Sequence, residues 1–177
     1  MPKLISLGRL AGLDIQARPS ALAGFTLLWV FLSALAAFNL HQPPFSALLG
    51  GFVASTMHYA SELWHNLGHA AAARRSGHPM TGVVFWGLLA TSRYPADEGE
   101  LPGKTHIRRA LGGPIASTFL ALLAGMLLAA QLDAAGSLRN WLTLFLFADN
   151  LLIFTLGSLL PLGFTDGSTL LRWWGKP

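Results

Sequence analysis

Four long apolar stretches alternate with short polar segments along the chain. Residues 21–40 contain no charged side chain and would extend about 30 Å as an α-helix, which matches the hydrocarbon core of a bilayer. Residues 46–73, 110–132 and 141–163 are of comparable length, and proline, glycine or basic residues punctuate the chain between the stretches. The pattern predicts an all-α, multi-pass membrane protein with four transmembrane helices.

Two segments outside these stretches have the character of β-structure. Residues 1–20 alternate loosely between aliphatic and polar positions, which predicts a short N-terminal strand or an interfacial segment. Residues 81–94 are apolar and aromatic, with Gly82 and Gly87 among them, which favours a membrane-associated β-hairpin between the second and third helices. We expect residues 1–177 to form one membrane-embedded domain.

Composition and charge agree with a bilayer environment. The chain is 53% hydrophobic and 11% charged, whereas a soluble domain carries roughly 25% charged residues. The absence of cysteine excludes disulfides and thiolate metal sites. Basic residues flank the apolar stretches instead of forming a stripe, so the net charge of +4 does not predict nucleic-acid binding. If both termini are cytoplasmic, all of the 12 Lys and Arg residues except Arg139 lie on the cytoplasmic side of the membrane. The positive-inside rule therefore favours this orientation.

Ionisable side chains form one stripe along the second predicted helix. His58, Glu62, His65 and His69 fall at helical spacing, and such groups inside a membrane are usually paired, metal-bound or functional. His65 and His69 lie one turn apart, so their imidazoles can converge on one ion. The spacing alone leaves two alternatives open, a hydrogen-bonded seam between helices and the ion pathway of a small transporter.

The residue that follows His65 changes the chemistry that the pattern predicts. Metalloproteases use the same spacing as His-Glu-x-x-His, in which the glutamate is the general base. Position 66 is asparagine, and an amide is not basic near neutral pH. Asp166 follows the fourth predicted helix, on the same side of the membrane and at a similar depth as the two histidines. The topology permits a His-His-Asp site, although Asp-Gly is also typical of a turn or a helix start.

Several motifs in order make the chain resemble the site-2 protease family of intramembrane zinc metalloproteases, as a compact member without PDZ or CBS domains. The resemblance covers nearly the whole chain. The segment Gly8 to Asp14 is similar to the family's N-terminal strand, and His65 to His69, with the basic Arg74 and Arg75 after it, is similar to the family's histidine helix. Gly113-Pro114-Ile115-Ala116-Ser117 is similar to the family's Gly-Pro-x-x-Asn signature. Pro161 to Asp166-Gly167 is similar to the segment that carries an aspartate ligand.

The resemblance implies one Zn²⁺ per chain, held by His65, His69 and Asp166, and a multi-pass protein of a prokaryotic cytoplasmic membrane with its metal site near the cytoplasmic side. It also implies that the hairpin binds an unwound transmembrane protein substrate as an added strand, as in regulated intramembrane proteolysis. The residues that we expect to contact substrate are Gly113, Pro114, Ser117, Phe85 and Gly87.

The departures from the family pattern bear on activity. Asn66 stands at the position of the general base, Ser117 and Ser158 stand where the family usually has asparagine, and Phe164 stands where proline is common. Glu62 lies one turn before His65, where it either substitutes as the base or orients an imidazole. The sequence predicts either a protease impaired at position 66 or a zinc-binding pseudoprotease that binds transmembrane partners without cleaving them. It does not indicate an oligomeric state.

Overall fold

The computed structural model describes residues 4–131 and 136–176. Helices predominate, and four short strands form one sheet. In chain order the elements are β1 (Ile5–Leu10), β2 (Leu13–Ala17), α1 (Pro19–Phe38), α2 (Pro44–Arg75), β3 (Gly82–Trp86), β4 (Leu89–Arg93), α3 (Gly103–Ala129), α4 (Leu138–Ala148), the π-helix η2 (Asp149–Gly157) and α5 (Asp166–Trp173).

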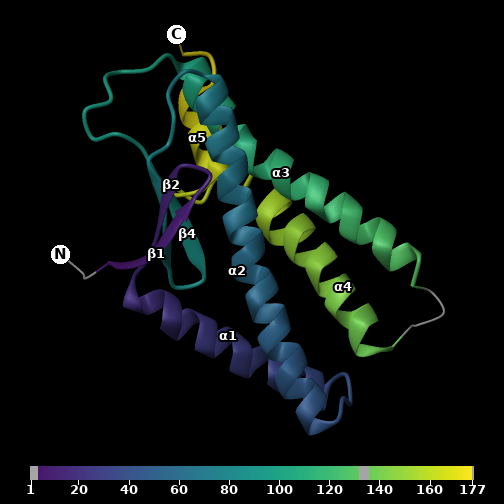
Figure 1. The fold of residues 1–177 in the computed structure, drawn as a ribbon. Helices are drawn as coiled ribbons and strands as arrows, with labels where there is room; N and C mark the ends of the chain where they lie inside the picture. Colours follow the sequence, from purple (N-terminus) through teal and green to yellow (C-terminus); the bar gives the residue numbers. More distant parts are fainter. Residues whose placement is uncertain (1–3, 132–135, 177) are drawn as a thin grey trace.

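Helix α2 runs through the middle of the molecule, with the sheet and α1 on one side and α3 and α4 on the other (Figure 1). Among the described residues, three helical segments are long and apolar enough to cross a membrane: α1, α3 and Leu138–Gly157, which joins α4 to η2. Helix α2 does not meet this criterion because it carries the polar stripe. Its crossing of the membrane therefore stays a prediction.

Helix boundaries differ from the expected spans for a physical reason. Helix α3 begins at Gly103, seven residues before the apolar stretch that predicted it. Hydropathy detects only the part of a helix that is apolar, whereas backbone hydrogen bonding continues through the polar turns that precede it. The seven extra residues place Arg109 within the helix.

The N-terminal segment forms two strands where one was expected, and they join the expected hairpin in a single sheet. Strands β1 and β2 form an antiparallel hairpin, and β2 pairs in parallel with β3 to give the order β1-β2-β3-β4. Ala11 and Gly12 have φ angles of 51° and 83°, which is the left-handed geometry of a two-residue hairpin turn. The β3–β4 hairpin between α2 and α3 was expected and is present, and its association with the membrane stays a prediction.

Packing brings α2 against both the sheet and α3. Ala70 and Ala73 of α2 join buried residues of β2 and β3 in a hydrophobic cluster. On the opposite side, a Cβ at Gly68 or Gly112 would collide with the carbonyl of the other glycine. The two helix backbones therefore approach closely through small residues, as membrane helices commonly do. This contact brings the start of α3 against the histidines of α2.

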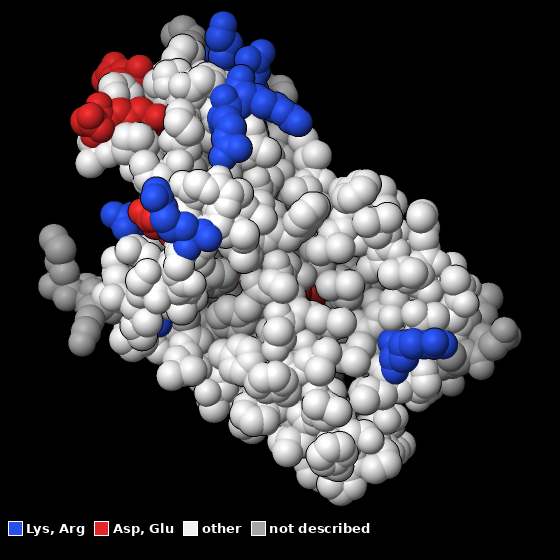
Figure 2. All heavy atoms as spheres, viewed as in Figure 1, with Lys and Arg blue, Asp and Glu red and all other residues white. Residues whose placement is uncertain are grey.

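On the visible face, charged side chains gather around the end of the molecule where α5 and the C-terminus lie and over the sheet, and one basic side chain lies apart from them near α4 (Figure 2). The wide uncharged surface between these groups is expected of a protein embedded in lipid. The orientation of that end toward the cytoplasm stays a prediction.

Candidate metal centre

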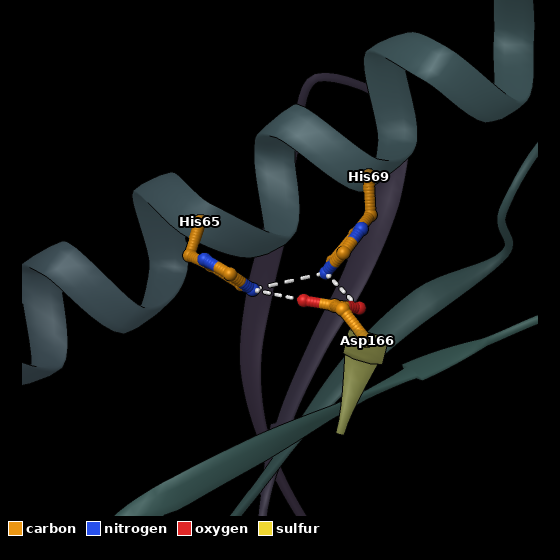
Figure 3. Close-up of side chains that lie close together, drawn as sticks. All are labelled: His65, His69 and Asp166. Atoms are coloured by element: carbon orange, nitrogen blue, oxygen red, sulfur yellow. Dashed lines mark hydrogen bonds and ion pairs between the residues drawn. The ribbon is translucent and has the colours of Figure 1, made fainter. Parts of the chain in front are cut away.

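His65 and His69 of α2 and Asp166 of α5 point toward one another (Figure 3). The two Nε2 atoms are 3.0 Å apart, and the Asp166 carboxylate lies 3.1 Å from His65 Nε2 and 3.3 Å from His69 Nε2. Residues about 100 positions apart in the chain thus meet at one point. All three side chains are largely shielded from solvent.

The other ring nitrogen of each histidine has its own partner. His69 Nδ1 lies 2.8 Å from the carbonyl of Arg109, and because a carbonyl only accepts, Nδ1 carries the proton. The Gly113 N–H also lies 3.2 Å from this nitrogen, but the shorter contact to the carbonyl decides the tautomer. His65 Nδ1 lies 3.0 Å from the hydroxyl of fully buried Ser117. These contacts fix both rings with Nε2 toward Asp166.

The donor set fits a zinc ion. The Arg109 carbonyl requires a proton on Nδ1 of His69, and the Ser117 hydroxyl can accept one from Nδ1 of His65. In these tautomers two Nε2 lone pairs and a carboxylate converge, an arrangement that a cation would stabilise. Two imidazoles and one carboxylate are typical ligands of a catalytic zinc, which leaves a fourth position open. Gly113 lies against the site, where a Cβ would overlap both Nε2 atoms. The space around the converging donors therefore depends on the absence of a side chain at this position.

A braced loop places Asp166. The segment 158–165 joins η2 to α5, and the Gly167 N–H donates to the Ser158 carbonyl at 2.9 Å. The Thr165 hydroxyl donates to the Leu160 carbonyl. A Cβ at Gly167 would overlap the Leu159 carbonyl, so this close approach requires glycine. These contacts fix the start of α5, and with it the carboxylate of its first residue.

Asn66 and Glu62 lie beside the donor cluster and are buried. The Asn66 amide donates to the Glu62 backbone carbonyl at 2.9 Å and contacts Glu62 Oε1 at 3.3 Å, while its oxygen accepts from Ser92 at 2.9 Å. Glu62 Oε1 also accepts the Ala90 N–H at 2.6 Å. The hydrogen bonds of the Glu62 carboxylate thus go to Asn66 and Ala90, and its role as a base or as a group that orients an imidazole stays a prediction.

A cavity of about 730 Å³ opens beside these residues. Strand β4 lines one side and the segment before α5 lines another. Its walls include His65, Asn66, His69, Asp166, Leu89, Ala90, Thr91, Ser92, Leu160, Leu162 and Phe164.

None of the five residues expected to contact substrate is among those that line this cavity. Phe85 is 6% exposed and packs in the hydrophobic cluster between the sheet and α2, because its position in β3 directs it to that face. Gly87 forms the hairpin turn and accepts the Tyr59 hydroxyl, which lies outside the cavity. Ser117 supports His65, and Pro114 is buried within α3. Gly113 alone of the five lies directly against the metal donors.

Arg109 supports the site in a way that the sequence analysis missed. Its guanidinium pairs with Glu98 at 2.5 and 2.8 Å, donates to the His78 carbonyl at 2.6 Å and lies 4.1 Å from the ring centroid of Tyr94. The hydrogen bonds from Arg109 hold the pKa of Glu98 below its usual range. Burial raises the pKa of Tyr94 to about 12. One signal was available, since Arg109 precedes Gly113 by one helical turn and so shares its face.

The N-terminal part of the polar stripe, around His58, makes contacts that are separate from the donor cluster. His58 Nδ1 lies 3.1 Å from Asp149, and its Nε2 lies 2.9 Å from the Leu88 carbonyl. Both partners are acceptors, so both ring nitrogens donate and the ring is a cation. Asn150 donates to Ser61 at 2.9 Å. Asp149 and Asn150 thus link the start of the π-helix η2 to α2.

Comparisons with known proteins agree with this architecture. The fold is similar to that of a solved structure, the Site-2 Protease from Methanocaldococcus jannaschii, with a TM-score of 0.64 and 18% sequence identity. The similarity covers 96% of this chain and 70% of that chain. No protein-family model and no curated protein sequence matches the chain. The resemblance expected from the motifs is thus confirmed in three dimensions, and the chain has the fold of a site-2 protease.

Proposed function

We propose that this protein is an intramembrane zinc metalloprotease of the site-2 protease type, acting on transmembrane proteins, with hydrolysis impaired by Asn66. The observation that carries the proposal is the convergence of two imidazole Nε2 atoms and one carboxylate beside a cavity, within a site-2 protease fold. A transporter would not require Asp166 to be braced against the two histidines by a dedicated loop.

The residues around the donors have distinct tasks. His65, His69 and Asp166 would hold the ion, which when bound would polarise a peptide carbonyl and activate water. The Arg109 carbonyl keeps His69 in the tautomer that presents Nε2, and the Ser117 hydroxyl holds the His65 ring in the orientation that does so. Strand β4 forms one wall of the cavity, where an extended peptide can add to the sheet.

Proton transfer is the step for which the site is poorly equipped. General base catalysis contributes about 10²–10⁴-fold, and Asn66 cannot accept a proton from water. Glu62 is the other buried acid beside the cluster, but its Oε1 atom already accepts from Ala90. We therefore expect slow hydrolysis or none.

The side chains of Asn66 and Glu62 are both held in hydrogen bonds with neighbouring residues. This supports a second candidate, a zinc-binding pseudoprotease that holds transmembrane partners without cleaving them. In that case Asn66 and Glu62 serve the binding cavity and not the chemistry. The two candidates share a fold and a metal site, so turnover separates them.

The test is cleavage of a model transmembrane substrate in detergent by the chain and by Asn66→Glu, each with and without a zinc chelator. The control is Asn66→Glu combined with His65→Ala, which restores the acid but removes a ligand. We expect cleavage by Asn66→Glu alone, abolished by the chelator and in the control. Cleavage by the unmodified chain at the same rate would show that another group supplies the base, with Glu62→Gln as the next variant. If neither form cuts any of a broad set of substrates, the pseudoprotease is favoured.

A further inference from the structure

Strand β4 presents polar backbone groups toward α2. Arg93 at the end of β4 accepts a hydrogen bond from Thr81 on the β3 side. Alternate residues of a strand direct their N–H and C=O groups to opposite edges, so Ala90 and Ser92 face away from β3. Because β4 is the last strand of the sheet, these groups lie where an added strand would pair.

The donor of Ala90 at this edge is already occupied. Glu62 Oε1 accepts the Ala90 N–H at 2.6 Å, a charge-assisted hydrogen bond, which is stronger than a neutral one. Two residues along the strand, the Ser92 hydroxyl donates to Asn66 at 2.9 Å. Both acceptors belong to α2, but only the bond to Glu62 involves a backbone group at the edge of β4, whereas Ser92 contacts the helix through its side chain.

Asn66 keeps the Glu62 carboxylate in place. Its amide nitrogen donates to the Glu62 backbone carbonyl and lies 3.3 Å from Oε1. An amide can donate to a carboxylate, whereas a glutamate at position 66 would bring a second negative charge close to the first. Asn66, which stands at the position of the general base, thus also stabilises Glu62 at the strand edge.

We propose that Glu62 is a removable cap on β4, whose carboxylate occupies the Ala90 N–H that the carbonyl of an extended peptide would take. This inference rests on the proposed binding of an unwound transmembrane segment and adds its control. A peptide that pairs with β4 must first displace Glu62, and Glu62 is therefore a positioning residue that sets how readily the edge accepts a strand. The cavity beside Glu62 leaves room for the displaced carboxylate.

The proposal predicts that removal of an acidic side chain strengthens binding. In Glu62→Ala the Ala90 N–H is free, and a peptide no longer has to break a charge-assisted hydrogen bond. We expect its affinity to rise about tenfold. A purely structural role for Glu62 predicts the opposite, because a disturbed cavity binds less tightly.

The experiment uses the full chain in detergent and a short, dye-labelled peptide of alternating valine and serine, with the dissociation constant measured by fluorescence anisotropy. Glu62→Gln is a second variant that retains the size of the side chain and has a weaker neutral acceptor, and it is expected to bind with an affinity between those of the other two forms. Glu100→Ala is the matched control, since it removes the same side chain at an exposed position outside the cavity. Its affinity should equal that of the unmodified chain.

Two further peptides, N-methylated at odd or at even residues, test whether binding occurs by strand pairing. One of the two should lose binding and the other should keep it, because only one set of N–H groups faces β4. Equal affinity of the unmodified chain, Glu62→Ala and Glu62→Gln would overturn the cap and leave the binding edge intact. Absence of peptide binding by all forms would contradict both the cap and the strand addition in the proposed function.

Discussion

Substitution of Gly113 by alanine is expected to remove zinc without unfolding the protein. Gly113 lies on the face of α3 that meets the two histidines, and an alanine Cβ there would overlap Nε2 of both rings. The substitution adds only a methyl group and leaves the three proposed ligands unchanged. It therefore tests whether the space between α3 and the rings belongs to the site.

The magnitude follows from the distances. The Cβ would lie 2.4 Å from Nε2 of both rings, whereas ordinary van der Waals contact begins at 3.4 Å. Each ring would have to withdraw by about 1.0 Å, the difference of these two values. Zinc–ligand distances tolerate only about 0.2 Å, and the withdrawal would also strain the contact with Ser117. Loss of ligand support typically lowers metal affinity about 10–100-fold, and we expect the upper end because both rings are affected.

Displacement of the two rings costs about 1–3 kcal/mol of packing, and the higher helix propensity of alanine offsets part of that cost. Alanine favours a helix over glycine by about 1 kcal/mol, so helix α3 itself tolerates the change. Gly125→Ala on the same helix is the control, since its Cβ would lie 3.2 Å from the edge of the Phe147 ring and far from the metal donors. Zinc affinity from competition with a chelator and unfolding temperature in detergent are the two measurements. Zinc affinity of Gly113→Ala equal to that of Gly125→Ala would refute the reasoning.

Two other predictions concern the contacts around the site. Glu98 has a lowered pKa because Arg109 binds its charged form. The stability that this pair contributes is therefore complete above the ordinary glutamate pKa of 4.5. It is lost as the pH falls through the lower pKa of the folded state. Thermal unfolding between about pH 6 and pH 3 should therefore show a smaller fall for Glu98→Gln than for the unmodified chain, and equal falls would contradict the pairing. Asp149→Ala leaves the cationic His58 without its counter-charge and should destabilise the protein by about 3 kcal/mol in a detergent unfolding titration, and a change within error would show that the pair contributes nothing.

The spacing of His65 and His69, one helical turn apart, predicted that their imidazoles converge, and the expected topology permitted Asp166 to join them. The family resemblance then implied these three residues as the ligand set. The structure brings these three side chains together. Their role as ligands stays a proposal, since neither the fold similarity nor the geometry measures metal binding.

Other features could not be read from the chain because they depend on tertiary packing. The hydrogen bond from Ala90 to Glu62 requires β4 to lie beside α2, which no periodicity encodes. Phe85 was expected to contact substrate because the family resemblance assigns substrate binding to the hairpin, but the register of β3 turns this side chain into the core. The two-strand N-terminal hairpin depends on positive φ at Ala11, a conformation that alanine rarely adopts and that its identity therefore did not suggest.

The most direct test of the account is the zinc content of the purified full chain, measured by elemental mass spectrometry alongside Asp166→Asn and Asp149→Asn. Both variants replace a membrane-associated aspartate by its amide, but only Asp166 lies at the donor cluster. We predict one zinc per chain in the unmodified protein and in Asp149→Asn, and almost none in Asp166→Asn. Zinc retained in full by Asp166→Asn, or absent from the unmodified chain after zinc supplementation, would contradict the proposed metal centre.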